Sequence, residues 1–423
     1  SGESYQLQFD SGNDSLSNVL VSPSAIAALV ENSQLIQAPG GTILMTAQAA
    51  SALMGGVVRN TGTIDASGIV EQGGVIRLSA SDSIFQSGKL LADAAPGSAA
   101  NGGEIWAISN LSNPSSLTEV AGTLSAKGGS AGGNGGFIET SASHLVLKPN
   151  LQVTTSGSPN AQGTWLLDPT NVTIDAATAN NIATALNANT NVSIVSATDP
   201  LSCSITCANT SAGAGDITIA SAITATGTGA LSLKSAGNIY INANVTTVGS
   251  QSYIGPVVLS NNPVLTTQNA YVFFGGAVNS ATPAGSSLSV QQGTGNVIFS
   301  GAVGTTNSLT TMTTGGTGPV SLGGSTATSG AQSIGGNLVL GASTLSLVSA
   351  ADGISITGSI STQPIYRFLT GGNYTLNNGA PIAASSVTDA LGVSYASGSF
   401  TWTPSFTQNS VSVLLVGGGG GGG

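Results

Sequence analysis

Glycine pairs recur in the N-terminal third of the chain, and each pair is followed by an alternation of apolar and other residues that is typical of a strand. The pairs are Gly40-Gly41, Gly73-Gly74, Gly102-Gly103 and Gly135-Gly136. Shorter strand patterns begin between them, at Gly62, Gly88 and Gly122. Self-similarity at a period of roughly 20–35 residues is the signature of a repeat architecture. The chain must therefore fold from stacked copies of a small unit that holds at least two strands.

The C-terminal half carries a second pattern, with apolar residues at positions p, p+2 and p+6. It occurs five times, at Ile217/Ile219/Ile223, Ile239/Ile241/Val245, Val272/Phe274/Val278, Val297/Phe299/Val303 and Ile354/Ile356/Ile360. Two positions is the side-chain period of a strand, so the first two residues face one side. The step to p+6 indicates a corner, after which a side chain points inward again.

Both patterns predict a β-solenoid. A single coil of short strands cannot bury its apolar side, whereas parallel stacking at about 4.8 Å per rung pairs the backbones and lines the apolar residues into interior columns. A β-sandwich is the alternative for short strands separated by turns. It fits less well, because sandwich strands rarely repeat the p, p+2, p+6 pattern and no Pro-rich or charged linker separates domains. We therefore expect an all-β fold, a parallel β-helix.

One segment departs from the strand pattern. Ile182 and Leu186 lie four positions apart, the spacing of one helical face, and Asp175 can cap the segment. We expect one short helix near residues 177–188 that packs across or beside the rod. The expected organisation is a β-helix of the first repeat family with this helix over 1–212, the second family over 213–362, an aromatic-richer β cap or packing region over 363–416, and a flexible glycine linker over 417–423.

Charge is scarce, and this excludes several classes of function. The 423 residues include 7 Lys+Arg, 17 Asp+Glu and 1 His, so 6% are charged, where an ordinary soluble domain has roughly 25%. A net charge of −10 without basic clusters argues against nucleic acid. No stretch approaches the ~18 apolar residues of a membrane span, so no membrane insertion is expected. Residues 1–20 lack the pattern of a signal peptide, so we interpret the chain as a mature or excised piece.

The sequence offers no convincing catalytic, cofactor-binding or metal-binding residues. Asp10 and Asp14 fit an ordinary polar turn better than a calcium site. His144 has no evident acidic partner. The glycine-rich run 128–136 lacks the Lys-Ser/Thr of a phosphate loop and predicts a corner between strands. Trp165 and Asp168 belong to a predicted core strand that ends in a turn, with Asp168 bonding to nearby backbone. We therefore expect a protein that is not an enzyme.

Cys203 and Cys207 are the only cysteines in the sequence. No neighbouring residue completes a metal site with them. We expect them to form a local disulfide that closes a small loop, which suits an oxidising exterior. Two free thiols are the alternative.

Two segments together carry a family resemblance. The first is Gly135, Gly136, Phe137, Ile138, Glu139 and Thr140, and the second, about 25 residues later, is Trp165, Leu166, Leu167, Asp168 and Pro169. A short helical segment and Asn191-Val-Ser-Ile follow them. This combination resembles the filamentous haemagglutinin family of two-partner secretion adhesins. The resemblance covers about residues 40–362.

The resemblance implies a right-handed β-helix that a dedicated outer-membrane partner transporter exports to the surface or surroundings of a Gram-negative bacterium. Family members adhere to host cells, to abiotic surfaces or to each other. The implied partners are therefore a host-cell, glycan or surface receptor and further copies of the chain. The secretion domain with its Asn-Pro-Asn-Gly type motif is not present, so we expect the export signals upstream of Ser1.

Two other functions are compatible with a β-helix. One is a polysaccharide-active enzyme, which would need adjacent carboxylates in a groove on the rod. The other is the stalk of a toxin-delivery or haemolytic member of the same secretion family, which would need an effector domain. The low charge also predicts that the rods associate into filaments, because few charges keep neighbouring rods apart, with 363–416 as the expected contact.

Overall fold

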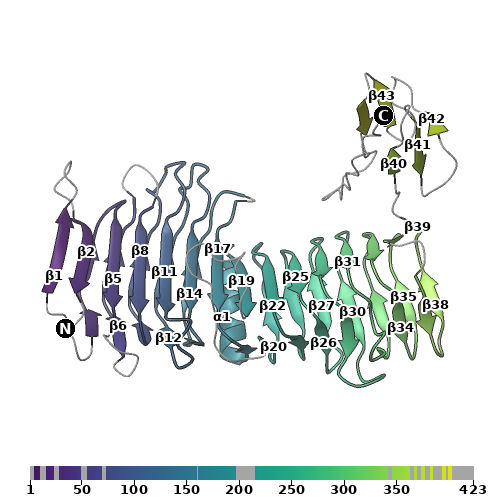
Figure 1. The fold of residues 1–423 in the computed structure, drawn as a ribbon, viewed down its shortest axis with the longest axis horizontal. Helices are drawn as coiled ribbons and strands as arrows, with labels where there is room; N and C mark the ends of the chain where they lie inside the picture. The colour runs from purple at the N-terminus through teal and green to yellow at the C-terminus, as the bar shows by residue number, and fades with distance from the viewer. Residues whose placement is uncertain are drawn as a thin grey trace, which may run out of the picture. The chain divides into compact units, whose positions relative to one another are not determined.

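The computed structural model describes residues 28–48, 55–68, 73–159, 161–196, 215–341 and 345–361 with their side chains, and the backbone of short strands within 4–22 and 362–402. The chain divides into two compact units, Ser1–Ser361 and Thr362–Gly423. In the first unit, short strands succeed one another in parallel coils (Figure 1). The predicted all-β fold, a parallel β-helix, is confirmed.

One sheet runs through the whole stack, and we call it the long sheet. Each coil contributes one strand to it, and neighbouring strands are parallel. Its 13 strands are, in order, β5 (Thr42–Ala47), β8 (Val75–Ala80), β11 (Glu104–Ser109), β14 (Phe137–Ser141), β17 (Thr164–Asp168), β19 (Asn191–Ser196), β22 (Leu231–Ser235), β25 (Gln251–Ile254), β28 (Val272–Phe274), β31 (Val297–Phe299), β33 (Val320–Leu322), β36 (Leu338–Leu340) and β39 (Ile360–Thr362).

Two five-stranded sheets complete the N-terminal coils. The β3 sheet comprises β3 (Ala28–Asn32), β6 (Gly56–Asn60), β9 (Ser83–Gln86), β12 (Leu117–Val120) and β15 (His144–Leu147). The β4 sheet comprises β4 (Leu35–Gln37), β7 (Thr63–Asp65), β10 (Lys89–Leu91), β13 (Thr123–Ser125) and β16 (Gln152–Thr154). The strands after the four glycine pairs stack in the long sheet, and those after Gly62, Gly88 and Gly122 stack in the β4 sheet. The first repeat family is thus in phase with the coils.

Different sheets complete the C-terminal coils. The β18 sheet comprises β18 (Val172–Ile174), β20 (Ile217–Ile219), β23 (Ile239–Ile241), β26 (Val257–Leu259) and β29 (Val278–Ser280), and single bridges at Val303 connect this face to the pair β34 (Thr326–Thr328) and β37 (Leu347–Ser349). The β21 sheet comprises β21 (Ile223–Thr224), β24 (Val245–Thr247), β27 (Val264–Thr267), β30 (Leu288–Gln291), β32 (Met312–Thr314), β35 (Gln332–Ile334) and β38 (Ile354–Ile356).

The second repeat pattern marks corners, and it is not in phase with the coils. Its first occurrence turns from β20 to β21, its third from β28 to β29, and its last from β38 to β39. These are the three different corners of a coil. In the last occurrence Ile354 and Ile360 are 39% and 59% exposed, because β38 and β39 are the terminal strands of their sheets.

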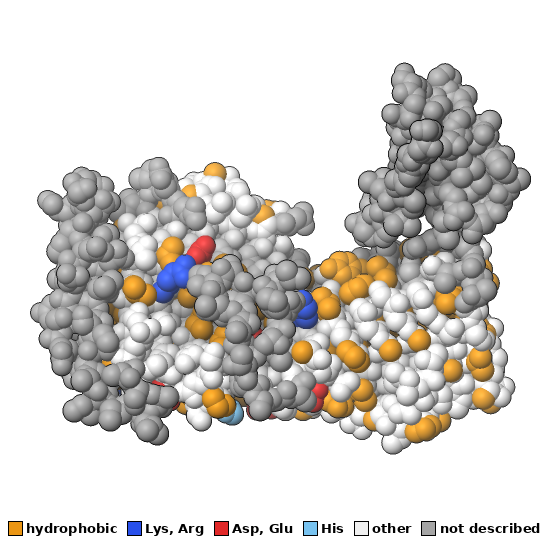
Figure 2. Space-filling model, viewed as in Figure 1, with side chains coloured by type: hydrophobic (Ala, Val, Ile, Leu, Met, Phe, Trp, Pro, Cys, Tyr) orange, Lys and Arg blue, Asp and Glu red, His pale blue; other side chains and the backbone are white. Residues whose placement is uncertain are grey.

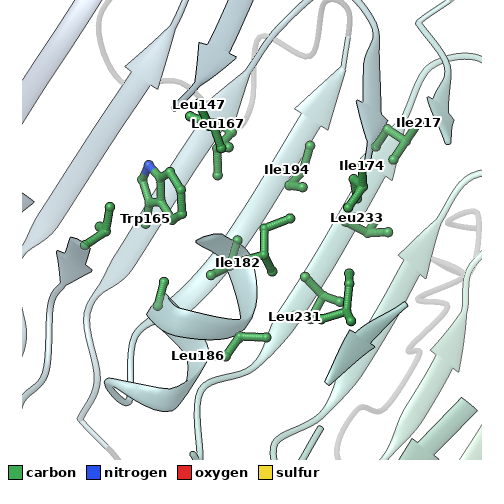
Figure 3. Close-up of a cluster of buried hydrophobic side chains, with 14 of the residues drawn as sticks. Leu147, Trp165, Leu167, Ile174, Ile182, Leu186, Ile194, Ile217, Leu231 and Leu233 are labelled. Carbon is green, nitrogen blue, oxygen red and sulfur yellow. The ribbon is translucent and has the colours of Figure 1, made fainter. Parts of the chain in front are cut away.

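The helix explains why the side sheets change. α1 (Ala176–Asn187) takes the place of the third strand in its coil, between β18 and β19. It packs against β16, where the β4 sheet ends, and against β21, where the β21 sheet begins. Its predicted residue range is confirmed, and so is the cap, because Asp175 accepts a hydrogen bond from the Thr178 N–H at 2.8 Å. The expected packing across or beside the rod is wrong, because the helix is part of the coil and contributes to the core. Ile182 and Leu186 point into the core among the strands of the rod (Figure 3).

A column of three aromatic rings lies inside the C-terminal coils. Tyr253, Phe274 and Phe299 are fully buried on β25, β28 and β31. Their ring centroids are 5.3 Å and 4.7 Å apart, and the second pair is parallel within 1°. The Tyr253 hydroxyl donates to Gln251 Oε1 at 2.9 Å, and burial raises its pKa. Equivalent positions of successive coils thus fill one continuous core.

A ladder of buried amides lies inside the N-terminal coils. Asn32 Nδ2 donates to Asn60 Oδ1 at 2.8 Å, and Asn60 Nδ2 donates to Gln86 Oε1 at 2.8 Å. The three side chains are almost fully buried. Each amide satisfies the next, because equivalent side chains of a β-helix lie one rung apart.

We expect Asn60→Ala to lower the free energy of unfolding by about 2 kcal/mol, because it removes one hydrogen bond of Asn32 and leaves the Oε1 acceptor of Gln86 unpaired in the core. Denaturant unfolding checks this, with Asn110→Ala as the control, since the side chain of Asn110 is exposed. Equal costs for the two variants would contradict the role of the ladder.

The remaining described strands are antiparallel. At the N-terminus β1 (Ser4–Phe9) pairs with β2 (Leu16–Ser22), and β2 lies beside β5. In the second unit, β40 (Tyr366–Phe368), β41 (Asn373–Leu376) and β42 (Ile382–Ala383) form one sheet, and β43 (Val393–Ala396) pairs with β44 (Ser399–Trp402). No helix in the described part of the chain is long and apolar enough to span a membrane.

Candidate functional site

The two segments of the family motif lie on adjacent rungs. β14 and β17 are neighbours in the long sheet, with Ile138 beside Trp165 and Ser141 beside Asp168. The Trp165 indole N–H donates to Thr140 Oγ1 at 3.0 Å, and both side chains are fully buried. The predicted core strand at Thr164–Asp168 is confirmed. The separation of about 25 residues between the segments is therefore the length of one coil.

The glycine pair of the motif has a packing role. A Cβ on Gly136 would collide with the carbonyl oxygen of Gly103 in the previous coil, and one on Gly135 would collide with the carbonyl oxygen of Thr155. The glycine-rich run before β14 connects the β4 sheet to the long sheet, so its prediction as a corner is confirmed. Glycine is needed here because the backbones of successive coils approach closely.

Two carboxyl groups of the motif are buried. Ile138, Trp165 and Leu167 belong to the core, so strand alternation places Glu139 and Asp168 on the outer side of the long sheet. They are nevertheless only 0% and 6% exposed. Ser141 Oγ donates to Glu139 Oε1 at 2.9 Å, whereas no described residue forms a hydrogen bond with Glu139 Oε2 or Asp168 Oδ1. The expected bonding of Asp168 to nearby backbone is not seen at Oδ1 among the described residues, and it stays a prediction for the rest of the side chain.

Burial makes both carboxyl groups weaker acids than exposed Glu and Asp side chains. It raises the pKa of Glu139 to about 7, and the negative charge of Asp168 adds to this, while the Ser141 hydrogen bond and Arg77 act in the opposite direction. Burial likewise raises the pKa of Asp168 to about 6. Burial favours the uncharged form, so each carboxyl group is protonated in a fraction of the molecules near neutral pH. No described lysine or arginine forms an ion pair with either group.

Next to this pair lies a group of four side chains that we call the outer cluster, formed by Arg77, Glu104, Trp106 and Phe137. The Arg77 guanidinium lies 5.0 Å from the centroid of the Trp106 ring. The Phe137 ring lies on the next rung, and its centroid is 4.9 Å from that of the Trp106 ring. The Trp106 indole N–H donates to Glu104 Oε2 at 3.0 Å, and Arg77 lies 3.8 Å from the same oxygen. These contacts hold the Glu104 carboxylate and the Trp106 ring in fixed positions.

A shallow groove of about 360 Å³ adjoins the outer cluster. It is lined by Asn101, Gly102, Gly103, Glu104, Asn134, Gly135, Gly136, Phe137, Gly163 and Thr164. These residues precede or begin β11, β14 and β17, so the groove crosses three successive coils. Its floor is backbone, because the glycines that let the coils approach have no side chains.

Of the outer cluster, Phe137 was singled out in the sequence as part of the family motif, whereas Arg77, Glu104 and Trp106 were not. Arg77, Trp106 and Glu139 each stand three positions after the second glycine of a pair, and they are adjacent in the long sheet. Aligning the repeats on the glycine pairs would have revealed this outward-facing column. The column is difficult to recognise in the sequence because its three positions carry an arginine, a tryptophan and a glutamate.

The other candidate residues do not assemble into a site. Among the described residues, no three or more His, Cys, Asp or Glu side chains are grouped to hold a metal. His144 is exposed at the start of β15. Cys203 and Cys207 lie outside the described residues, and so do Asp10 and Asp14. The disulfide therefore stays a prediction.

The comparisons with known proteins identified no relative. No protein-family model, curated protein or solved structure matches this chain.

Proposed function

We propose that this chain is the rod of a secreted adhesin of the two-partner secretion type, which acts by presenting a surface and not by catalysis. The observation that carries the proposal is the stacking of the two motif segments on β14 and β17 of a parallel β-helix. In this proposal an outer-membrane transporter exports the chain, and the rod adheres to cells, glycans or other surfaces outside a Gram-negative bacterium.

The scarcity of charge on the C-terminal coils supports a role in contact. Between residues 217 and 361, Lys234 and Asp352 are the only charged residues. On the face seen in Figure 2, the coils at the C-terminal end of the stack present hydrophobic and uncharged polar side chains. Two such surfaces repel each other weakly. Association between copies of the chain is therefore part of the proposal.

The burial of the motif carboxyl groups argues against the enzymatic alternative. A glycosidase needs two carboxyl groups that flank the scissile bond of a bound substrate. Glu139 and Asp168 are the described carboxyl groups with strongly raised pKa values, yet they are 0% and 6% exposed. A polysaccharide chain cannot reach them in this arrangement.

We expect the purified chain to bind host cells or glycan-coated surfaces saturably, with little loss of binding at high salt, because few charges are available for screening. Surface plasmon resonance at low and high salt measures this, and light scattering of the same samples reports self-association. The heat-unfolded chain is the control. Reproducible release of oligosaccharides from pectin or neutral glycans by the pure protein would overturn the proposal, as would equal binding by folded and unfolded chains.

A further inference from the structure

The groove offers side-chain groups for recognition, because its backbone is already engaged. The N–H of Gly102 donates to the carbonyl of Asn134, and the N–H of Gly136 donates to that of Ala126. By contrast, no hydrogen bond within the described residues engages the side chains of Asn134 and Thr164 or the Oε1 atom of Glu104. A ligand would therefore meet one amide, one hydroxyl and one carboxylate oxygen.

These groups suit a polyhydroxylated ring. Glu104 is held through its other oxygen by Trp106 and Arg77, so Oε1 is a fixed acceptor for ligand hydroxyls. The Phe137 ring is half-buried against Trp106 and supplies an apolar surface for the C–H face of a sugar. A few placed polar groups beside an aromatic ring are typical of small-molecule sites.

We propose that this groove binds a neutral oligosaccharide lying along the rod axis. Among the described residues that line the groove there is no lysine or arginine, and the Glu104 carboxylate repels anionic sugars. At roughly 4.8 Å per rung, the first and third coils are about 10 Å apart. This span matches about two pyranose rings, so the groove holds about two sugar units of a longer chain. The inference rests on the proposed function, because it names the receptor chemistry of an adhesin.

Calorimetric titration with a panel of neutral trisaccharides and tetrasaccharides, namely manno-, cello-, xylo- and galacto-oligosaccharides, tests the inference. Oligogalacturonate and heparin fragments form the acidic arm. We expect at least one neutral ligand to bind. Phe137→Ala should weaken it at least tenfold, and Glu104→Gln at least fivefold.

Matched controls separate recognition from folding. Phe273→Ala removes another half-buried outward phenylalanine of the long sheet, on β28. Glu119→Gln removes another carboxylate in an ion pair, that with Lys148 at 2.9 Å. Both variants should bind the ligand as the unchanged chain does. Because Phe137→Ala also removes a contact of Trp106, Phe137→Leu and the circular dichroism spectra of all variants show whether weaker binding reflects unfolding.

Each outcome bears on one proposal. The groove proposal is overturned if no neutral oligosaccharide binds, if only acidic ones bind, or if folded Phe137→Ala and Glu104→Gln variants keep full affinity. Adhesion to cells that persists in these two variants would also place the receptor site elsewhere, with the adhesin proposal intact. Oligosaccharide binding by a chain that adheres to no surface would refute the adhesin proposal and leave the groove.

Discussion

Replacing Phe274 by alanine should lower the free energy of unfolding by about 4 kcal/mol. The side chain is fully buried, and truncating a buried phenylalanine typically costs about 3–5 kcal/mol because it loses apolar burial and leaves a cavity. Here it would also break both ring contacts, with Tyr253 and with Phe299. Neither neighbour can fill the space, because each is held on its own rung.

Denaturant unfolding and hydrogen exchange measure this loss. In a solenoid each coil contacts only its neighbours, so we expect the increase in exchange to be largest in β25, β28 and β31. Phe273→Ala is the control on the same strand, because that side chain faces outward and is half-buried. Phe274→Leu should recover part of the stability. A cost below about 1 kcal/mol for Phe274→Ala would contradict the importance of the aromatic column.

The rod should lose stability as the pH rises from about 4.5 to about 7, because of Glu139. In the unfolded chain this carboxyl group ionises at its ordinary pKa, whereas in the folded rod burial raises its pKa to about 7. Below about pH 4.5 both states hold the proton and the group has no effect. Between the two pKa values only the unfolded state ionises, so the unfolded state is favoured, by about 3 kcal/mol at pH 8.

Glu139→Gln should remove most of this pH dependence, because glutamine resembles the protonated acid. We expect the variant to be more stable than the unchanged chain by about 2–3 kcal/mol at pH 8 and similar to it at pH 4.5. Urea unfolding across this range checks the difference, with Glu119→Gln as the control. Asp168 should contribute in the same direction, because burial raises its pKa to about 6. If Glu139→Gln destabilises the rod equally at both pH values, the carboxyl group has only a packing role.

These two predictions concern different parts of the rod. The aromatic column stabilises the nearly uncharged C-terminal coils, and the acid pair lies where the long sheet passes from one set of side sheets to the other. Acidic surroundings should therefore strengthen the rod near β14 and β17 and leave the C-terminal coils unchanged. Hydrogen exchange resolved by segment distinguishes the two effects.

Features that depend on neighbours along the chain could be predicted from the sequence. Glycine pairs, the two-residue strand period and the corner step are local, so they predicted the parallel β-helix. The helix and its cap at Asp175 were predictable for the same reason, since capping and the spacing of Ile182 and Leu186 lie within one segment. Local pattern also located the motif strands around Ile138 and Trp165.

Features that depend on the stacking of distant coils could not be predicted from the sequence. The p, p+2, p+6 pattern is the same at every corner, so sequence could not assign its occurrences to particular corners. Arg77, Trp106 and Phe137 meet because their strands follow one another in the long sheet, and the groove exists because successive glycine pairs align across coils. Glu139 and Asp168 face outward by strand period, yet both are buried. A local pattern assigns a side chain to one face of a strand, but whether that face is covered depends on segments packed there from elsewhere in the chain.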